Sequence, residues 1–310
     1  TKSVVNGDYY LHVKVRSGVT SYYASRLFKF DNTPPVITLK GNNPLVLAYG
    51  DSYVERGIEY SDTYDLCPQY TSPDFNIVKN NILGTYILKY TVKDNAGNLA
   101  TISRTINVED VVPPVASAIS LGTDEDKILS FSDEAFVSSY SDDLTPLTKI
   151  KILSLPSTGI LKLGGSGISI NQIINATDID NITYKPEDNW NGNLSFDYSS
   201  LDTYNNESNR SVVNILVNHI NDNPCANNDI VSTDEDNSKT FNVINNDTDV
   251  ETDTINLVVH AITQGEHGFV LNNNDGTLTY SPDENWHGTD SFTYTVKDSD
   301  NGTGSGTVTI

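Results

Sequence analysis

A stretch of about twenty residues that occurs twice constrains this chain more than any other feature. Residues 182–202 read ITYKPEDNWNGNLSFDYSSLD and residues 278–298, which begin 96 positions later, read LTYSPDENWHGTDSFTYTVKD. The recurring residues are Tyr184, Pro186, Asn189, Trp190, Gly192, Phe196, Tyr198 and Asp202, which return as Tyr280, Pro282, Asn285, Trp286, Gly288, Phe292, Tyr294 and Asp298. Repetition at a domain's length predicts an array of similar modules rather than one fold built around a single cleft.

Alternation of apolar and polar residues predicts that these modules are made of strands. In residues 84–94 one face carries Tyr86, Leu88, Tyr90 and Val92, and in residues 291–298 one face carries Phe292, Tyr294 and Val296. A period of two with one apolar face is typical of a strand that packs on a core from one side. Helical periodicity is almost absent, and Gly, Asn, Asp and Pro turns separate the strand signals. We therefore predict an all-β fold, a tandem array of β-sandwich domains.

Acidic residues followed by proline mark the joints between modules. Such joints occur in residues 30–39 (FDNTPPVITL), 108–117 (VEDVVPPVAS) and 218–227 (NHINDNPCAN). Proline fixes φ and restricts the residue before it, so these joints are stiffer than Gly/Ser linkers. The predicted modules are the last strands of a truncated domain at 1–31, a compact domain at 32–110, and two larger domains at 111–222 and 223–310.

Composition narrows the class of partner. The net charge is −22 with an isoelectric point near 4.3, which argues against nucleic acid and is compatible with a multivalent cation. No run of 18 apolar residues is present, so we predict no membrane span in this segment. Cys67 and Cys225 lie in different predicted modules, and we expect no bridge between them. The first residues already have the pattern of a strand, so we expect the chain to be part of a longer protein.

One segment carries a specific family resemblance. Residues 34–108 contain PPVITL, GDSYVERG and the closing YTVKDNAGN, and they resemble the bacterial Ig-like domain of surface proteins. Residues 1–31 resemble the end of another module of that kind.

Residues 111–310 resemble two cadherin-like repeats of large bacterial adhesins. The last repeat has NDNPCANND, STDED, NVINNDTDVETDTINLVV and then the Asn-Trp-x-Gly hairpin, in the order that this family uses. The middle repeat keeps GTDEDK at 122–127, but it has only Asp142 and Asp143 where the acidic loop is expected. The resemblance implies a structural or adhesive stalk outside the cell, stiffened by calcium, that has no catalytic activity.

The acidic loop of the last repeat is the strongest metal-site candidate. Its carboxylates stand at every second position: Asp247, Asp249, Glu251 and Asp253. Calcium takes six to eight hard oxygen ligands, and a turn with acids at this spacing can wrap one ion. The spacing lacks the central glycine and the distal glutamate of an EF-hand, so that motif is rejected. The alternative is a solvated polar turn in an acidic protein.

The joints provide further candidates. We expect Asn221, Asp222 and Asn223 to share ions with Asp234, Glu235 or Asp236, and expect a weaker equivalent formed by Glu109 and Asp110 with Asp124, Glu125 and Asp126. His219 stands where the cadherin-type linker begins with aspartate, which departs from that pattern. The alternative is that these residues cap turns, since Asn and Asp are good turn formers.

The search for catalytic motifs finds none, so we predict that this chain is not an enzyme. The five histidines have no zinc spacing, and there is no Gly-x-Ser-x-Gly, phosphate-binding loop or dinucleotide fingerprint. We predict a stalk or fibre segment of a bacterial cell-surface protein, whose partners are calcium ions and neighbouring domains. Two alternatives stay open. In one, the chain binds a glycan or a protein on the host or cell surface through the aromatic stretch 60–75. In the other, it serves as accessory modules of a secreted enzyme.

Overall fold

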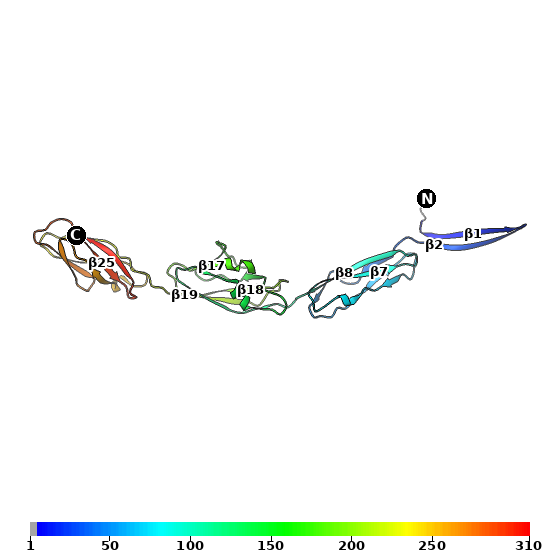
Figure 1. The fold of residues 1–310 in the computed structure, drawn as a ribbon, viewed down its shortest axis with the longest axis horizontal. Coiled ribbons are helices and arrows are strands. Elements are labelled where there is room, and N and C mark those ends of the chain that lie inside the picture. The colour runs from blue at the N-terminus through cyan, green and yellow to red at the C-terminus, as the bar shows by residue number, and fades with distance from the viewer. Residues whose placement is uncertain (1–4) are drawn as a thin grey trace. The chain divides into compact units, whose positions relative to one another are not determined.

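The computed structural model describes residues 5–310, so the first four residues of the predicted module 1–31 lie outside the described part. Strands make up most of the regular structure (Figure 1). The helices are short: α1 (Asp133–Ser139) and the 3-10 helices η1 (Phe75–Ile77), η2 (Ala176–Asn181) and η3 (Thr254–Asn256). The chain divides into two compact units: Thr1–Ala116 with Tyr140–Ile150 and Ser199–Asn209, and Ser117–Ser139 with Lys151–Tyr198 and Arg210–Ile310.

The described chain begins with a two-stranded antiparallel hairpin. Its strands are β1 (Gly7–Ser17) and β2 (Thr20–Phe30), paired from Gly7 with Phe30 to Ser17 with Thr20. Large apolar side chains are exposed along both strands, among them Tyr10, Val15 and Tyr23. The apolar side chains of this hairpin are therefore not packed into a core.

Residues 36–109 form two facing sheets. One sheet pairs β3 (Val36–Leu39) with β5 (Ile58–Ser61), and the other has the order β4 (Leu45–Ala48), β8 (Leu99–Glu109), β7 (Gly84–Lys93) and β6 (Gln69–Thr71). Leu88, Tyr90 and Val92 are buried, so the apolar face predicted for residues 84–94 is confirmed. A tight turn closes the β7–β8 hairpin, where Gly97 has a φ of 102°.

Residues 115–218 form three sheets. The largest has the order β10 (Ile119–Asp124), β19 (Ser211–Asn218), β18 (Gly192–Leu201), β13 (Lys149–Ile152) and β16 (Ile173–Asn175). The second has β11 (Leu129–Ser130), β17 (Ile182–Lys185), β14 (Ile160–Leu163) and β15 (Ser166–Gly167), and the third pairs β12 (Tyr140–Ser141) with β9 (Val115–Ala116).

Residues 229–309 form a second pair of facing sheets. One has the order β20 (Asp229–Ile230), β26 (Thr303–Thr309), β25 (Ser291–Lys297) and β22 (Val258–Ile262), and the other has β21 (Lys239–Asn242), β24 (Thr277–Pro282) and β23 (Gly268–Asn272). Phe292, Tyr294 and Val296 are buried in the core, which confirms the face predicted from their alternation.

One strand arrangement occurs three times. In each case an early strand pairs in parallel with the last strand, which pairs antiparallel with the strand before it: β4–β8–β7, β10–β19–β18 and β20–β26–β25. The predicted all-β tandem sandwich fold is therefore confirmed. Every sheet pairs strands from only one predicted module, while the limits at 31/32, 110/111 and 222/223 themselves stay a prediction.

The repeated stretch of sequence contributes the same core residue to two of these domains. Tyr184 in β17 and Tyr280 in β24 are fully buried, and each ring packs on a glycine. A Cβ atom on Gly159 or Gly268 would come within 2.6 Å of the ring or hydroxyl of its tyrosine. In both domains the repeated tyrosine thus fills the space that the glycine, which has no side chain, leaves open.

Arg104 is a fully buried cation in β8. Its guanidinium donates to the carbonyl oxygens of Lys40 at 2.7 Å and Asn42 at 2.8 Å, and it lies 3.6 Å from the Glu55 carboxylate. A buried charge is tolerated only when it is paired and hydrogen-bonded in this way.

We expect Arg104→Ala to lower the free energy of unfolding by about 3–5 kcal/mol, because it leaves the Glu55 carboxylate without its cationic partner and the carbonyl oxygens of Lys40 and Asn42 without their donor. Faster hydrogen exchange in β7 and β8 would locate the loss. Arg56→Ala, at an exposed arginine in the same domain, serves as the control. Equal protection in the two variants would contradict the role assigned to Arg104.

Asp290 is a buried carboxylate with a full set of donors. It accepts from the backbone N–H groups of Glu266, His267 and Ser291 and from the Tyr280 hydroxyl, at 2.8–3.0 Å. Burial alone raises the pKa of this carboxyl, but the hydrogen bonds outweigh it and hold the pKa of Asp290 below its ordinary value.

We expect this carboxylate to make part of the stability depend on pH. The unfolded state binds the proton more readily, so the contribution is complete above the unfolded pKa of about 3.9 and is lost as pH falls through the lower folded pKa. Asp290→Asn should cost roughly 2 kcal/mol at neutral pH and flatten the acid limb of a stability–pH curve measured by denaturant titration. The exposed Asp283→Asn is the control, and an unchanged acid limb in Asp290→Asn would exclude this role.

Candidate metal centres at the linkers

Three sets of polar residues of the same design lie beside the linkers, the segments that follow β2, β8 and β19. Each set combines a linker residue three positions before a proline, an aspartate in a loop, and an aspartate where the last two strands turn. The sets are Asp31, Asp62 and Asp94; Asp110, Asp142 and Asp202; and Asn221, Asp249 and Asp298. The linker prolines are Pro34, Pro113 and Pro224.

The first set brings together carboxylate oxygens from Asp31, Asp62 and Asp94, all within 4.8 Å of one another. Asp94 is buried in the β7–β8 turn and accepts from the backbone N–H groups of Gly97 and Asn98 at 2.7 Å. Burial raises the pKa of Asp94, but hydrogen bonds from Asn98 and the turn hold it below its ordinary value. Asn98 Nδ2 also reaches the carbonyl oxygen of Asp31 at 3.3 Å, so the turn holds the linker.

The second set repeats this geometry with Asp110, Asp142 and Asp202, again within 4.8 Å. Asp202 accepts from the backbone N–H and side-chain Nδ2 of Asn206, both at 2.7 Å, and the same Nδ2 donates to the Asp110 carbonyl oxygen at 3.0 Å. Asp110 and Asp202 are buried. Burial, and after it the negative charge of these carboxylates, raises the pKa of Tyr140 to about 12.

The third set replaces the linker aspartate with an amide. Asn221 Nδ2 donates to Asp298 Oδ2 at 2.9 Å, and Asp298 also accepts from the Asp300 and Gly302 N–H groups at 2.8 Å. Asp249 accepts from the Thr252 N–H at 2.6 Å, as Asp62 and Asp142 accept from their own loops. This set therefore carries one formal charge less than the other two.

Several oxygen atoms in these sets are buried and have no hydrogen-bond donor. They are Asp62 Oδ2, Asp249 Oδ2 and Asn221 Oδ1, together with Asp222 Oδ2 of the third linker. Burying an acceptor without a partner costs free energy, and calcium prefers carboxylate and amide oxygens of this kind. The residues present therefore fit a hard divalent cation at the linkers.

The predicted acidic loop does not converge on one point. Asp247 is only 1% exposed and accepts from the Asn227 N–H at 2.7 Å and the Tyr294 hydroxyl at 2.9 Å. Asp249 belongs to the third set, and the exposed Asp253 precedes η3 as its N-cap residue. The expectation that all four acids wrap one ion is corrected, because a hydroxyl of the core draws Asp247 inward.

The expected pairing of the third linker with Asp234, Glu235 and Asp236 is also corrected. Those acids follow β20, which pairs in parallel with the end of β26, whereas Asn221 and Asn223 lie against Gly302 at its beginning. Seven strand residues separate the two places by about 20 Å. Asp236 instead accepts from the Asn285 N–H, as a turn residue does.

The acids expected to pair around the second linker have separate partners. Asp124 accepts from Asn218 Nδ2 at 3.1 Å and Asp126 from the Asn189 N–H at 3.0 Å. Glu109 lies in β8, where its carbonyl accepts from the Tyr49 N–H. Asp110 alone of these residues belongs to one of the three sets.

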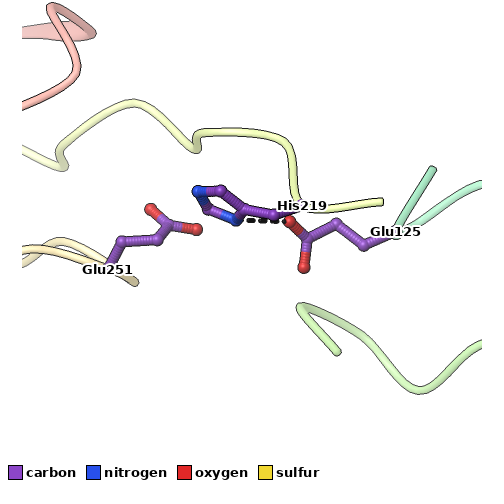
Figure 2. Close-up of side chains that lie close together, drawn as sticks. All are labelled: Glu125, His219 and Glu251. Atoms are coloured by element: carbon purple, nitrogen blue, oxygen red, sulfur yellow. Dashed lines mark hydrogen bonds and ion pairs between the residues drawn. The ribbon is translucent and has the colours of Figure 1, made fainter. Parts of the chain in front are cut away.

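A different cluster forms around the third linker. His219 Nδ1 lies 3.0 Å from Glu125 Oε1, and Glu251 offers a third ligand atom within 4.8 Å of both. Figure 2 shows the imidazole between the two carboxylates. Glu125 is buried, which raises its pKa, but donors from Ile220, Asn191 and His219 hold the pKa of Glu125 below its ordinary value.

Sequence reasoning missed most members of the three sets. The missed aspartates are Asp31, Asp62, Asp94, Asp142, Asp202 and Asp298, and Glu125 was expected with other partners. One sequence pattern could have identified two of them. Asp94 and Asp202 each stand at the end of a strand, four residues before an asparagine. The fold then brings each turn to the linker.

These sheets define a protein of tandem β-sandwich domains. Residues 37–108 match the family model of the bacterial surface protein Ig-like domain, and residues 221–310 match that of the bacterial Ig domain. The chain is thus a tandem protein with bacterial Ig-like domains. The match at 37–108 confirms the resemblance predicted there, whereas the last repeat, whose motifs resemble a cadherin-like repeat, matches a bacterial Ig domain. A comparison with curated proteins found no match. Among residues 5–310, no helix combines the length and apolar character that crossing a bilayer requires.

The similar solved structures include cadherins. Drosophila N-cadherin EC1-4 is 12% identical, with a TM-score of 0.35 over 97% of this chain and 82% of that one. Domains 1–4 of protocadherin gamma B7 are 12% identical, with a TM-score of 0.36 over 98% and 83%. An endo-fucoidan hydrolase of glycoside hydrolase family 107 is 14% identical, with a TM-score of 0.27 over 90% and 44%. At such low scores these likenesses carry no conclusion, and the cadherin-like resemblance rests on the sequence motifs.

The hydrogen bonds of Asn206 to Asp202 and to the Asp110 carbonyl oxygen predict that this side chain holds the second linker against the turn. We expect Asn206→Ala to increase hydrogen exchange at residues 110–112 by roughly tenfold, because losing one hydrogen bond to a buried carboxylate and one to a linker carbonyl costs about 1.5 kcal/mol or more. Thr203→Ala, which changes an exposed residue of the same turn, is the control. Unchanged exchange at 110–112 in Asn206→Ala would show that the turn does not hold the linker.

Proposed function

We propose that this chain is a structural segment of a bacterial cell-surface protein, a stalk or fibre whose linkers are stiffened by calcium and which has no catalytic role. The matches to bacterial surface Ig-like domains support the location outside the cell. The tandem sandwich fold supports a mechanical role, because such arrays build length by repetition. The proposed domains are 1–31, 32–110, 111–222 and 223–310.

The observation that carries the proposal is the threefold recurrence of the linker sets. In the first two sets, the carboxylate before a domain lies within 4.8 Å of carboxylates from a loop and from the terminal hairpin of that domain. In the third set, Asn221 donates to Asp298 of the terminal hairpin. In the first two sets three carboxylates lie within 4.8 Å, where their mutual repulsion favours a bound cation. The buried, donorless oxygens of Asp62, Asp249 and Asn221 support the same conclusion.

Calcium would be held by the residues of these sets and would supply the positive charge that they lack. The chain's own hydrogen bonds already orient the ligands, since the turn asparagines Asn98 and Asn206 fix both a hairpin carboxylate and the linker backbone. An ion bound there would be coordinated by oxygen atoms of the linker and of the loop at the same time. Bending at the linker would then require breaking metal–oxygen bonds.

A second candidate role is binding of a glycan or a protein at residues 60–75. Tyr60, Tyr64, Leu66 and Tyr70 are exposed there, and the rings of Tyr60 and Tyr70 stack with centroids 5.9 Å apart. Exposed aromatic side chains can stack on sugars or fill a protein pocket. A glycan array probed with the full chain and with Tyr64→Ala distinguishes this role from a purely mechanical one.

The calcium proposal is tested by calorimetric titration of the chelator-treated chain. We expect binding with dissociation constants of roughly 10⁻⁴–10⁻³ M, the range of extracellular modules. Asp142→Asn should remove binding at the second linker, because asparagine keeps the Oδ1 acceptor for the loop N–H groups and loses the charge. The control is Asp143→Asn, at the exposed neighbour.

Small-angle scattering of the same samples reports the mechanical consequence. We expect a chelator to broaden the distribution of interatomic distances, and excess calcium to narrow it. A wild-type chain that binds no calcium at millimolar concentration, or an Asp142→Asn variant that binds as the wild type does, would overturn the calcium role. The chain would then be a spacer held only by its hydrogen bonds.

A further inference from the structure

The third linker differs from the other two in the chemistry of one residue. His219 stands two positions before the linker member Asn221. The residues two positions before Asp31 and Asp110 are Lys29 and Val108. The Nδ1 atom of His219 lies 3.0 Å from Glu125 Oε1, and its side chain is 47% exposed. Of the three linkers, only this one therefore has an imidazole among its candidate metal ligands.

Both carboxylates beside His219 accept hydrogen bonds from other residues of the chain. Glu125 is only 3% exposed and accepts from the Ile220 N–H and, at 3.4 Å, from Asn191 Nδ2. Glu251 accepts from the Asp222 N–H at 3.3 Å. One ligand atom from each of the three residues lies within 4.8 Å of the others, as Figure 2 shows for the two glutamates on either side of the ring.

This donor set differs in kind from the oxygen-only sets. Calcium and magnesium take oxygen ligands, whereas an imidazole nitrogen with carboxylates suits zinc and the neighbouring transition metals. Zinc sites with three protein ligands and one water are common, and Glu and His are among the usual ligands. On the same linker as His219, Asn221 Oδ1 and Asp222 Oδ2 are buried without donors, so this linker is short of positive charge.

We propose that Glu125, His219 and Glu251 form a zinc-type site that clasps the third linker to the turn after β10 and to the loop before η3. The proposal goes beyond the calcium-stiffened stalk and does not depend on it, because it uses a different donor set and a different metal. It makes the third linker respond to a transition metal in addition to the calcium that is proposed for all three linkers.

The test is a zinc titration of the chelator-treated full chain, followed by calorimetry in a buffer that contains saturating calcium. We expect one zinc ion per chain. His219→Ala should weaken zinc binding by more than about 100-fold, because even outer-shell changes at zinc sites cost 10- to 100-fold. Cobalt substitution should give visible absorption bands in the wild type that His219→Ala abolishes.

Two further variants separate loss of the proposed zinc ligand from a general effect of substitution. His260→Ala removes an exposed histidine of β22 and should bind zinc as the wild type does. His219→Asp replaces nitrogen with oxygen and should lose zinc affinity while gaining calcium affinity at this linker. A chain that binds no zinc at millimolar concentration, or a His219→Ala variant that retains wild-type affinity, would overturn the site. Neither result would alter calcium binding by Asp142, so the two proposals fail separately.

Discussion

Carboxylates crowded beside the linkers are the constraint on which the rest of this structure depends. In a chain of net charge −22, six aspartates gather into two groups whose oxygen atoms lie within 4.8 Å. Such groups are stable only if backbone and asparagine donors, or a cation, offset the repulsion. The turn hydrogen bonds of Asp94 and Asp202 provide the first kind of compensation, and the donorless oxygen of Asp62 indicates the need for the second.

The sandwich cores also place tyrosine hydroxyls against buried aspartates. Tyr280 donates to Asp290, which has three backbone donors as well, and the pKa of Asp290 is low. Tyr294 donates to Asp247, but Asp247 has fewer donors and lies near Asp229, so burial and, for Asp229, the neighbouring charge raise the pKa of both carboxyls. The same tyrosine–aspartate pair thus occurs once with a full set of hydrogen-bond donors, at Asp290, and once with fewer donors, at Asp247. The difference lies in how many backbone N–H groups point at each carboxylate.

The three linkers are variations on one arrangement with different ligands. The first two have a linker aspartate, the third has Asn221, and only the third has a nearby histidine between two glutamates. Replacing a carboxylate with an amide lowers the local charge, and adding an imidazole changes which metals the site prefers. Repetition of a fold therefore does not require identical chemistry at each joint.

The sequence by itself determined the strands of this protein, the faces that they bury and the turns that join them. The period-two faces of Tyr90 and Tyr294, the turn at Gly97 and the repeated tyrosine hairpin all follow from local pattern, because strand burial and turn conformation depend on neighbouring residues. Which acids meet was decided only by the tertiary structure. Asp31 and Asp94 are brought together by the sheet order and the hairpin turn, over a sequence separation that no spacing rule covers. Asp247 and Asp249, two residues apart, are separated because one carboxylate bonds to a core hydroxyl and the other to its own loop.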